Sequence, residues 1–512
     1  MALARVKSLL LLCLVVGVAT YVIVLRSDLF NDRKTQLRGL LLKRDARAEK
    51  KGPPRTRGLN VDDRLIAHKW EGKGRVNKMN QGMAVFQNSP IQKATPVITT
   101  PSRKLPRNAE KTHEKSMLVG LLNTSKLKVH KWFYSPEEKE SKWERCKRLI
   151  SGEEKLNESL VPSNDSNILE MYSPDQDCGS VLQARFGHPP VTEEESHLPI
   201  GFSFLIYKNA RLFERILQAI YMPHNVYCIH IDKKSPAGFH EAILATIRCL
   251  PNVFISANST KVFWGHFSVV QAQLYCMQEL LQSPVKWKYY INLVGQDFPL
   301  YVNSEIVKAL QGLKNHNNIE SPRLSKRYEN RTKFVHLKNE YGTTYITNEP
   351  KGPPPQNITI FKGSTFIIAT REFVDFVIYS QVAKDFVKFL KDTFVPDETL
   401  YASLQQYPGA PGGIRGRQPR WIPRALYWRV FRGDDICHGI WIRLICWITF
   451  EDLQWALGDE KKDKLFVHKI PFDFSDDLIE CILVARQGRK YPSGVWNQET
   501  RRKATPKKIN QR

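Results

Sequence analysis

Two aspartates stand where a chain of this kind could bind a ligand. Asp232 and Asp297 each lie just past an apolar segment that we predict to be a strand. Ligands of open α/β sheets bind outside the carboxyl ends of the strands, where a carboxylate can hold a hydroxyl group or a cation. Turn and capping aspartates occupy the same positions, so both interpretations stay open for each residue.

The common motifs of phosphate and metal chemistry are missing. No Asp-x-Asp follows a predicted strand, and the adjacent Asp434 and Asp435 would point to opposite sides of an extended segment. The sequence contains no P-loop, no GxGxxG, no Gly-x-Ser-x-Gly and no His-Glu-x-x-His. A metal–diphosphate site built on paired aspartates is therefore not predicted.

Glu398 is a third candidate, because it ends a Pro396-Asp397-Glu398 segment that precedes an apolar helical run. A positioned carboxylate can take a proton as a general base. A glutamate in this place also suits the start of a helix, where it would serve as a cap. The pattern alone leaves both roles open.

The segments that must position these residues alternate between strand and helix. Their apolar patterns predict strands over 200–207, 225–231, 252–255 and 287–294, and helices over 210–221, 237–250 and 268–281. This alternation predicts an α/β domain with a mostly parallel central sheet. We expect the globular domain to cover residues 146–485, followed by a basic tail over 486–512.

The N-terminus predicts a membrane anchor. Residues 9–25 read LLLLCLVVGVATYVIVL, follow a short basic tail (1–8) and end at Arg26. A cleaved signal peptide is the alternative, but the bulky end of the run offers no small-x-small site. We expect one uncleaved transmembrane helix in the bilayer, with the basic tail in the cytosol. The shortness of the span favours an early secretory membrane, Golgi or endoplasmic reticulum.

Residues 26–145 have the composition of a stem. They hold 28 Lys and Arg residues against 13 Asp and Glu residues, and so carry +15 of the net charge of +26. Frequent prolines interrupt any regular pattern, which is typical of an extended linker. A solvated stem is the preferred interpretation, and a patch for acidic glycans is the alternative. A lumenal position and the lack of nucleic-acid motifs exclude nucleic-acid binding.

Cysteines and sequons indicate an oxidising compartment. Besides Cys13 in the predicted span there are eight cysteines, an even number, and no Cys-x-x-Cys that would suggest zinc. The Asn-x-Ser/Thr sequons, which predict N-glycosylation in a lumenal chain, are at Asn123, Asn157, Asn164, Asn258, Asn330 and Asn357.

Five ordered segments resemble the core 2 / I-branching β-1,6-N-acetylglucosaminyltransferase family. They are RILQAIYMPHNVYCIHID (215–232), YINLVGQDFP (290–299), FKGSTFIIATRE (361–372), VPDE (395–398) and C-x-G-x-x-I-R-x-I-C (437–446). The resemblance covers about residues 146 to 485. It implies a nucleotide-sugar transferase fold of the GT-A type that works without a divalent metal or another cofactor, which agrees with the missing Asp-x-Asp.

The resemblance also assigns roles. It implies that Glu398 is the catalytic base and that Arg443 and Lys469 replace a metal at the diphosphate of UDP-GlcNAc; exposed basic residues are the alternative for both. The implied donor-binding residues are Leu205, Ile206, Tyr207, Asp232, Lys233, Lys234, Trp264, Arg443 and Lys469. Trp264 stands where the family has a tyrosine, and core packing is its alternative role.

The acceptor side departs from the family pattern. The implied acceptor-binding residues are Glu320, Tyr328, Arg331 and Trp428. Tyr328 replaces a lysine, Val430 replaces a tyrosine, and residues 409–417 form a shortened, altered stretch. A glycan on Asn330 would lie beside Arg331. The disulfides that the resemblance implies are Cys146–Cys481, Cys178–Cys249, Cys228–Cys276 and Cys437–Cys446.

The resemblance predicts a type II Golgi membrane enzyme with a lumenal catalytic domain. It would transfer N-acetylglucosamine to a glycoprotein O-glycan, with core 1, core 3 and poly-N-acetyllactosamine open as acceptors. An inactive glycan-binding protein and a xylosyltransferase-like enzyme are the alternatives. The departures at Tyr328 and Val430 favour the inactive protein, whereas Glu398, Arg443 and Lys469 favour the enzyme. A homodimer through the stem or the span is compatible with the sequence.

Overall fold

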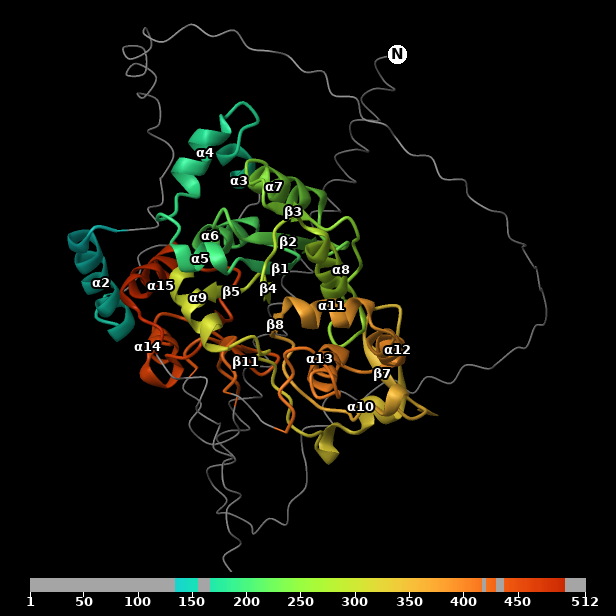
Figure 1. Cartoon of the computed structure of the whole chain (residues 1–512). Coiled ribbons are helices and arrows are strands. Elements are labelled where there is room, and N and C mark those ends of the chain that lie inside the picture. Colours follow the sequence, from blue (N-terminus) through green and yellow to red (C-terminus); the bar gives the residue numbers. More distant parts are fainter. Residues whose placement is uncertain (1–133, 155–165, 417–419, 430–436, 493–512) are drawn as a thin grey trace, which may run out of the picture. The chain divides into compact units, whose positions relative to one another are not determined.

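The computed structural model describes residues 134–154, 166–416, 420–429 and 437–492, all within the compact unit Ala109–Arg512 (Figure 1). The predicted anchor, most of the predicted stem and the end of the basic tail lie outside these residues. Among the helices of the described ranges, none is both long and apolar enough to cross a bilayer.

A five-stranded sheet forms the centre. Its strands are β1 (Ile200–Ile206), β2 (Val226–Ile231), β3 (Val253–Ile255), β4 (Tyr289–Val294) and β8 (Ile368–Thr370), in the order β3-β2-β1-β4-β8. Three of the four pairings are parallel, and only β4 with β8 is antiparallel. The predicted α/β class with a mostly parallel sheet is therefore confirmed, and the predicted strands match within a few residues.

The α-helices of the described ranges are α2 (Pro136–Ser151), α3 (Ser166–Met171), α4 (Cys178–Arg185), α5 (Glu193–His197), α6 (Ala210–Ile220), α7 (Ala237–Ile247), α8 (Ser268–Gln282), α9 (Asn303–Gly312), α10 (Asn330–Lys333), α11 (Arg371–Tyr379), α12 (Gln381–Phe389), α13 (Leu400–Leu404), α14 (Leu453–Leu457) and α15 (Asp476–Gly488). Short 3-10 turns are η1 (Lys326–Tyr328), η2 (Pro355–Asn357), η3 (Leu390–Asp392), η4 (Pro396–Glu398) and η5 (Asp459–Lys461).

Both faces of the central sheet are buried. Side chains alternate along a strand, so Phe202 and Phe204 of β1 join a core with α6, α7 and α15. Cys228 of β2 and Tyr290 of β4 join a second core with α8, α11 and α12. Burial on both faces explains why the strands read as nearly continuous apolar runs, which is typical of parallel sheets.

Three smaller sheets build the region around the candidate site. β12 (Phe466–His468) pairs parallel with β9 (Arg424–Leu426) and antiparallel with β5 (Asp297–Pro299). β6 (Phe334–Lys338) and β7 (Thr344–Pro350) form one hairpin, and β10 (Ile440–Ile442) and β11 (Ile445–Trp447) form another. β12 thereby places Lys469 next to the residues that follow β4.

The disulfides fix distant parts of the chain. The structure contains all four pairs that the resemblance implied: Cys146–Cys481, Cys178–Cys249, Cys228–Cys276 and Cys437–Cys446. Cys146–Cys481 joins α2 to α15. Helix α2 begins at Pro136 with a capping box between Ser135 and Glu138, so ordered structure starts before the predicted boundary at Cys146.

Candidate active site

Arg443 occupies the tip of a disulfide-closed hairpin. Arg443 and Leu444 connect β10 to β11 and have φ angles of 53° and 64°. A two-residue turn with positive φ at both positions is of type I′, which Asn and Gly adopt with least strain. Two bulky residues in this conformation indicate that the surroundings hold the tip in place.

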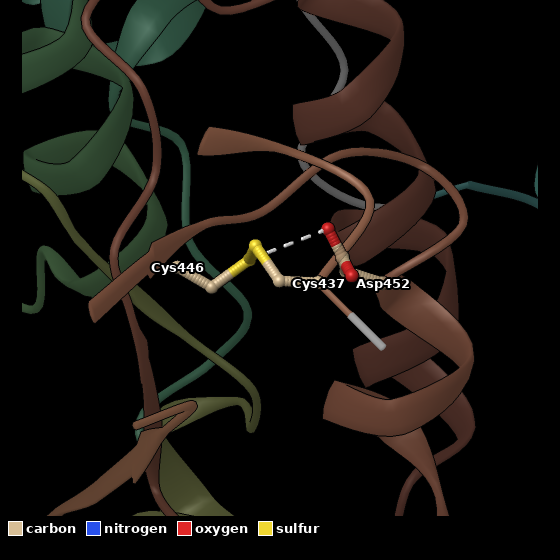
Figure 2. Close-up of side chains that lie close together, drawn as sticks. All are labelled: Cys437, Cys446 and Asp452. Atoms are coloured by element: carbon tan, nitrogen blue, oxygen red, sulfur yellow. Dashed lines mark hydrogen bonds between the residues drawn. A yellow bond between two sulfur atoms is a disulfide. The ribbon is translucent and has the colours of Figure 1, made fainter. Parts of the chain in front are cut away.

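The Cys437–Cys446 disulfide and Asp452 supply part of that support (Figure 2). Asp452 is buried, accepts the main-chain amides of His438 and Thr449 at 3.0 and 2.9 Å, and its Oδ2 lies 3.7 Å from Cys446 Sγ. Both sulfurs are used in the disulfide, so these three residues do not offer thiolate ligands to a metal. The cluster is a scaffold for the hairpin.

Lys469 lies beside this hairpin. Its Nζ donates to the carbonyl of Ile442 at 3.3 Å, and its side chain is largely buried. Burial lowers the pKa of Lys469 to about 8, and the positive charge of Arg443 contributes to the same shift. Two cations that repel each other at a partly buried position form a place where an anion is stabilised.

The predicted donor residues gather around the same cations. The Arg443 guanidinium lies 5.1 Å from the ring of Trp264, which is half exposed and so is not a core residue. Burial raises the pKa of Tyr207, the positive charge of Arg443 lowers it, and the negative charge of Asp232 raises it. The side chains of Tyr207, Arg443 and Asp232 are therefore close enough to interact. Asp232 Oδ1 accepts the amide of Lys234 at 2.9 Å, so this carboxylate has the turn role that was one of its two open interpretations.

Three further donor candidates lie on the same strand ends. Leu205 and Ile206 close β1, and the carbonyl of Ile206 accepts the amide of Asp232 at 2.9 Å. The side chain of Ile206 is buried in the core, so only its main chain faces this region. Lys233 is exposed and its amide bonds to the carbonyl of Thr260 at 3.1 Å.

Asp297 has a structural role. It is fully buried, pairs with Arg424 at 3.0 Å, and accepts from the amide of Val294 at 2.8 Å and from His468 Nδ1 at 2.9 Å. Burial raises its pKa, but Arg424 and His468 lower it more, so the carboxyl stays ionised. The turn-aspartate interpretation therefore applies, and Asp297 fixes the residue that precedes Lys469.

Glu398 ends η4 and does not cap the helix that follows. Thr399 takes the capping position of α13 and makes no side-chain cap. The Glu398 carboxylate instead accepts from Arg331 Nη1 at 2.6 Å through Oε2. Val395, three residues earlier, has a φ of 51°, a strained conformation for a β-branched residue. A rigid, strained turn thus presents Glu398.

The acceptor candidates Glu320, Tyr328 and Arg331 surround Glu398. Arg331 stacks 4.5 Å from the ring of Tyr328. Burial raises the pKa of Glu320, and the charge of Glu398 raises it as well, so these two carboxyls are close enough to interact. Trp428 lies elsewhere: it is half exposed and bridges to Ile445 of the Arg443 hairpin. Val430 lies outside the described residues.

Two residues that were not predicted complete the site. Phe394 packs edge-on against Trp264 at 5.6 Å and lies 5.8 Å from the Arg331 guanidinium, so it connects a predicted donor residue with a predicted acceptor residue. Lys362 Nζ lies 3.6 Å from Glu398 Oε2. Phe394 directly precedes VPDE, and Lys362 is the second residue of FKGSTFIIATRE, so their places beside these motifs were a usable signal.

Three of the six predicted sequons lie in the described residues. Asn258, Asn330 and Asn357 are exposed, and Asn330 starts α10 next to Arg331. Asn123, Asn157 and Asn164 lie outside the described residues. One Asp-x-Asp does occur, at Asp175-Gln176-Asp177, but it follows helix α3, and Asp177 caps α4 by accepting the amide of Ser180 at 2.8 Å.

Known proteins resemble this chain over the same region. The Core-2/I-branching enzyme family profile matches residues 200–456, half of the chain. The human "Beta-1,3-galactosyl-O-glycosyl-glycoprotein beta-1,6-N-acetylglucosaminyltransferase 3" is 37% identical over 336 residues, which cover 63% of this chain and 75% of that protein. Its mouse counterpart is 34% identical over 362 residues, covering 66% and 81%. A bovine herpesvirus 4 protein of similar name is 37% identical over 314 residues, covering 59% and 70%. This chain is a member of the Core-2/I-branching enzyme family.

Proposed function

We propose that this chain is an inverting glycosyltransferase. It moves N-acetylglucosamine from UDP-GlcNAc to the 6-hydroxyl of a galactose- or GalNAc-containing glycan, without a divalent metal. The observation that carries the proposal is a chain of contacts from Arg443 through Trp264, Phe394 and Arg331 to Glu398. It connects a cationic pair suited to a diphosphate with a carboxylate suited to a base.

The proposed reaction uses both ends of this chain of contacts, Glu398 at one end and Arg443 with Lys469 at the other. Glu398 takes the proton of the acceptor hydroxyl. At the same time the oxygen of that hydroxyl forms a bond to the anomeric carbon of N-acetylglucosamine. The bond from that carbon to the β-phosphate oxygen breaks, and UDP leaves with the electron pair. Arg443 and Lys469 stabilise the charge that develops on the β-phosphate, as a metal would elsewhere. Attack from the side opposite UDP inverts the anomeric configuration.

The two cations support metal independence. Arg443 offers a planar guanidinium whose fork of donors suits phosphate oxygens, and Lys469 is held beside it by the neighbouring carbonyl of Ile442. The central sheet and the residues at the ends of β1 and β2 agree with a GT-A-type donor site. Trp264 would stack on the donor and Asp232 would bind its nucleoside.

The relatives' names support the acceptor and the compartment. They describe transfer to galactosyl-O-glycosyl-glycoproteins, so we infer a mucin-type O-glycan or poly-N-acetyllactosamine as acceptor here. The predicted anchor over 9–25, the four disulfides and the exposed sequons agree with a single-pass type II Golgi membrane protein.

The direct test is turnover of UDP-GlcNAc by the purified chain. The acceptors are Galβ1-3GalNAc, a core 3 disaccharide and poly-N-acetyllactosamine, with UDP-xylose and a serine peptide as the matched alternative pair. We expect UDP release and a β-1,6-linked product on at least one glycan. Glycan binding without product would show an inactive binding protein, and xylosylation of the peptide would show the other reaction class.

A further inference from the structure

Residues Lys362 and Gly363 lie between the two carboxylate residues of the acceptor side. The amide of Gly363 donates to the carbonyl of Glu398 at 2.6 Å, and the amide of Lys362 donates to the carbonyl of Pro322 at 3.2 Å. A Cβ on Gly363 would lie 2.1 Å from the carbonyl oxygen of Glu320. Only glycine permits this approach, so the backbone fixes the start of the Lys362 side chain.

The ammonium group of Lys362 faces the reacting carboxylate. Its Nζ lies 3.6 Å from Glu398 Oε2, the same oxygen that accepts from Arg331. Within the described ranges no hydrogen bond reaches Glu398 Oε1. Two cations therefore anchor one oxygen and leave the other open for the acceptor hydroxyl.

Lys362 also acts on Glu320. Burial is the largest effect on Glu320 and raises its pKa. The positive charges of Lys362 and Lys464 lower this pKa, and the negative charge of Glu398 raises it. Glu398 itself faces Arg331, Lys362 and the buried Asp397. Burial and the charge of Glu398 raise the pKa of Asp397 to about 6. Lys362 is thus the positive charge shared by two carboxyls that repel each other.

Lys362 also lies near the predicted acceptor residue Tyr328. Lys362 Nζ lies 5.6 Å from the ring of Tyr328. We infer that Lys362 is a positioning residue for the acceptor, which holds Glu398 by one oxygen and keeps Glu320 able to accept a hydrogen bond from a sugar hydroxyl. This inference rests on the proposed function.

The test compares Lys362→Met, Lys362→Arg and the matched control Lys333→Met. Lys333 is an exposed lysine on α10 that pairs with Glu329 at 2.5 Å and does not contact the carboxyl pair. For each variant we would measure the KM of acceptor and donor, the pH profile of kcat/KM for acceptor, the melting temperature, and acceptor affinity in the presence of UDP by calorimetry.

We expect Lys362→Met to raise the acceptor KM and Kd about tenfold, with an unchanged donor KM. The acidic limb of its pH profile should move to higher pH, because Glu320 becomes easier to protonate without the nearby ammonium group. Lys362→Arg should restore the acceptor affinity and the pH profile, and Lys333→Met should match the parent chain in both. Parent-like acceptor affinity and pH profile in Lys362→Met would overturn the inference. Acceptor binding that depends on Lys362 in a chain without turnover would refute the proposed function alone.

Discussion

Arg331 Nη1 donates a 2.6 Å hydrogen bond to Glu398 Oε2. Both side chains are about one-fifth exposed, so solvent only partly weakens the pair. The guanidinium is also in contact with the rings of Tyr328 and Phe394, at 4.5 and 5.8 Å, which limits its movement. Arg331 therefore sets the orientation of the carboxylate that we assign as the base.

Replacement of Arg331 by Met should misalign Glu398. We expect kcat to fall about 10²-fold, because small errors in the placement of a base are costly. UDP binding should be unchanged, since Arg331 lies on the acceptor side. Steady-state kinetics and calorimetry with UDP check both points. A normal kcat would show that Glu398 does not depend on this ion pair.

Activity should survive EDTA. In the proposed mechanism Arg443 and Lys469 supply the positive charge at the diphosphate, so removal of divalent cations should change kcat by less than about twofold. The measurement is turnover after dialysis against chelator, with and without added Mn²⁺. If chelation abolished transfer and Mn²⁺ restored it, the metal-free mechanism would be wrong.

Transfer should weaken at alkaline pH. Because burial and Arg443 lower the pKa of Lys469 to about 8, its charge is complete below that pH and is lost as the pH rises through it. In the free enzyme this loss should reduce kcat/KM for UDP-GlcNAc, whereas kcat should be less affected because bound diphosphate favours the charged lysine. Lys469→Arg should move the alkaline limb to higher pH. A limb that stays in place would assign the titration to another group.

Reduction of Cys437–Cys446 should harm activity before the domain unfolds. This disulfide closes the hairpin that carries Arg443 across a separation of 9 residues, and a guanidinium must be held still to stabilise phosphate charge. Graded reduction should raise the donor KM while circular dichroism stays constant, and non-reducing mass spectrometry should recover the linked peptide. Arg443→Glu should raise the donor KM sharply with the disulfide intact. Unchanged donor KM in that variant would remove Arg443 from the donor site.

The central sheet could be predicted because its strands are buried on both faces. The apolar runs at 200–207 and 225–231 became β1 and β2 almost without change. Helix α2 was assigned to the stem as far as residue 145, because its sequence PEEKESKWERCKRLIS is mostly charged. Its order depends on packing against α15 and on Cys146–Cys481, which are contacts across more than three hundred residues.

Residues of the candidate site could be predicted where they belong to a sequence motif. They could not be predicted where residues from distant segments of the chain meet in the fold. VPDE and the cysteine loop pointed to Glu398 and Arg443. The pairing of Asp297 with Arg424, residues 127 positions apart, cannot be read from local pattern. Phe394 likewise gains its place between Trp264 and Arg331 only when three distant segments meet.

The most direct measurement is single-site replacement of the base. Glu398→Gln keeps the shape of the side chain and can still accept from Arg331, but it cannot take the proton of the acceptor hydroxyl. We predict that transfer from UDP-GlcNAc falls about 10²–10⁴-fold while the Kd for UDP stays within error of the parent. Turnover close to that of the parent chain would contradict the assignment of Glu398 and with it the proposed mechanism.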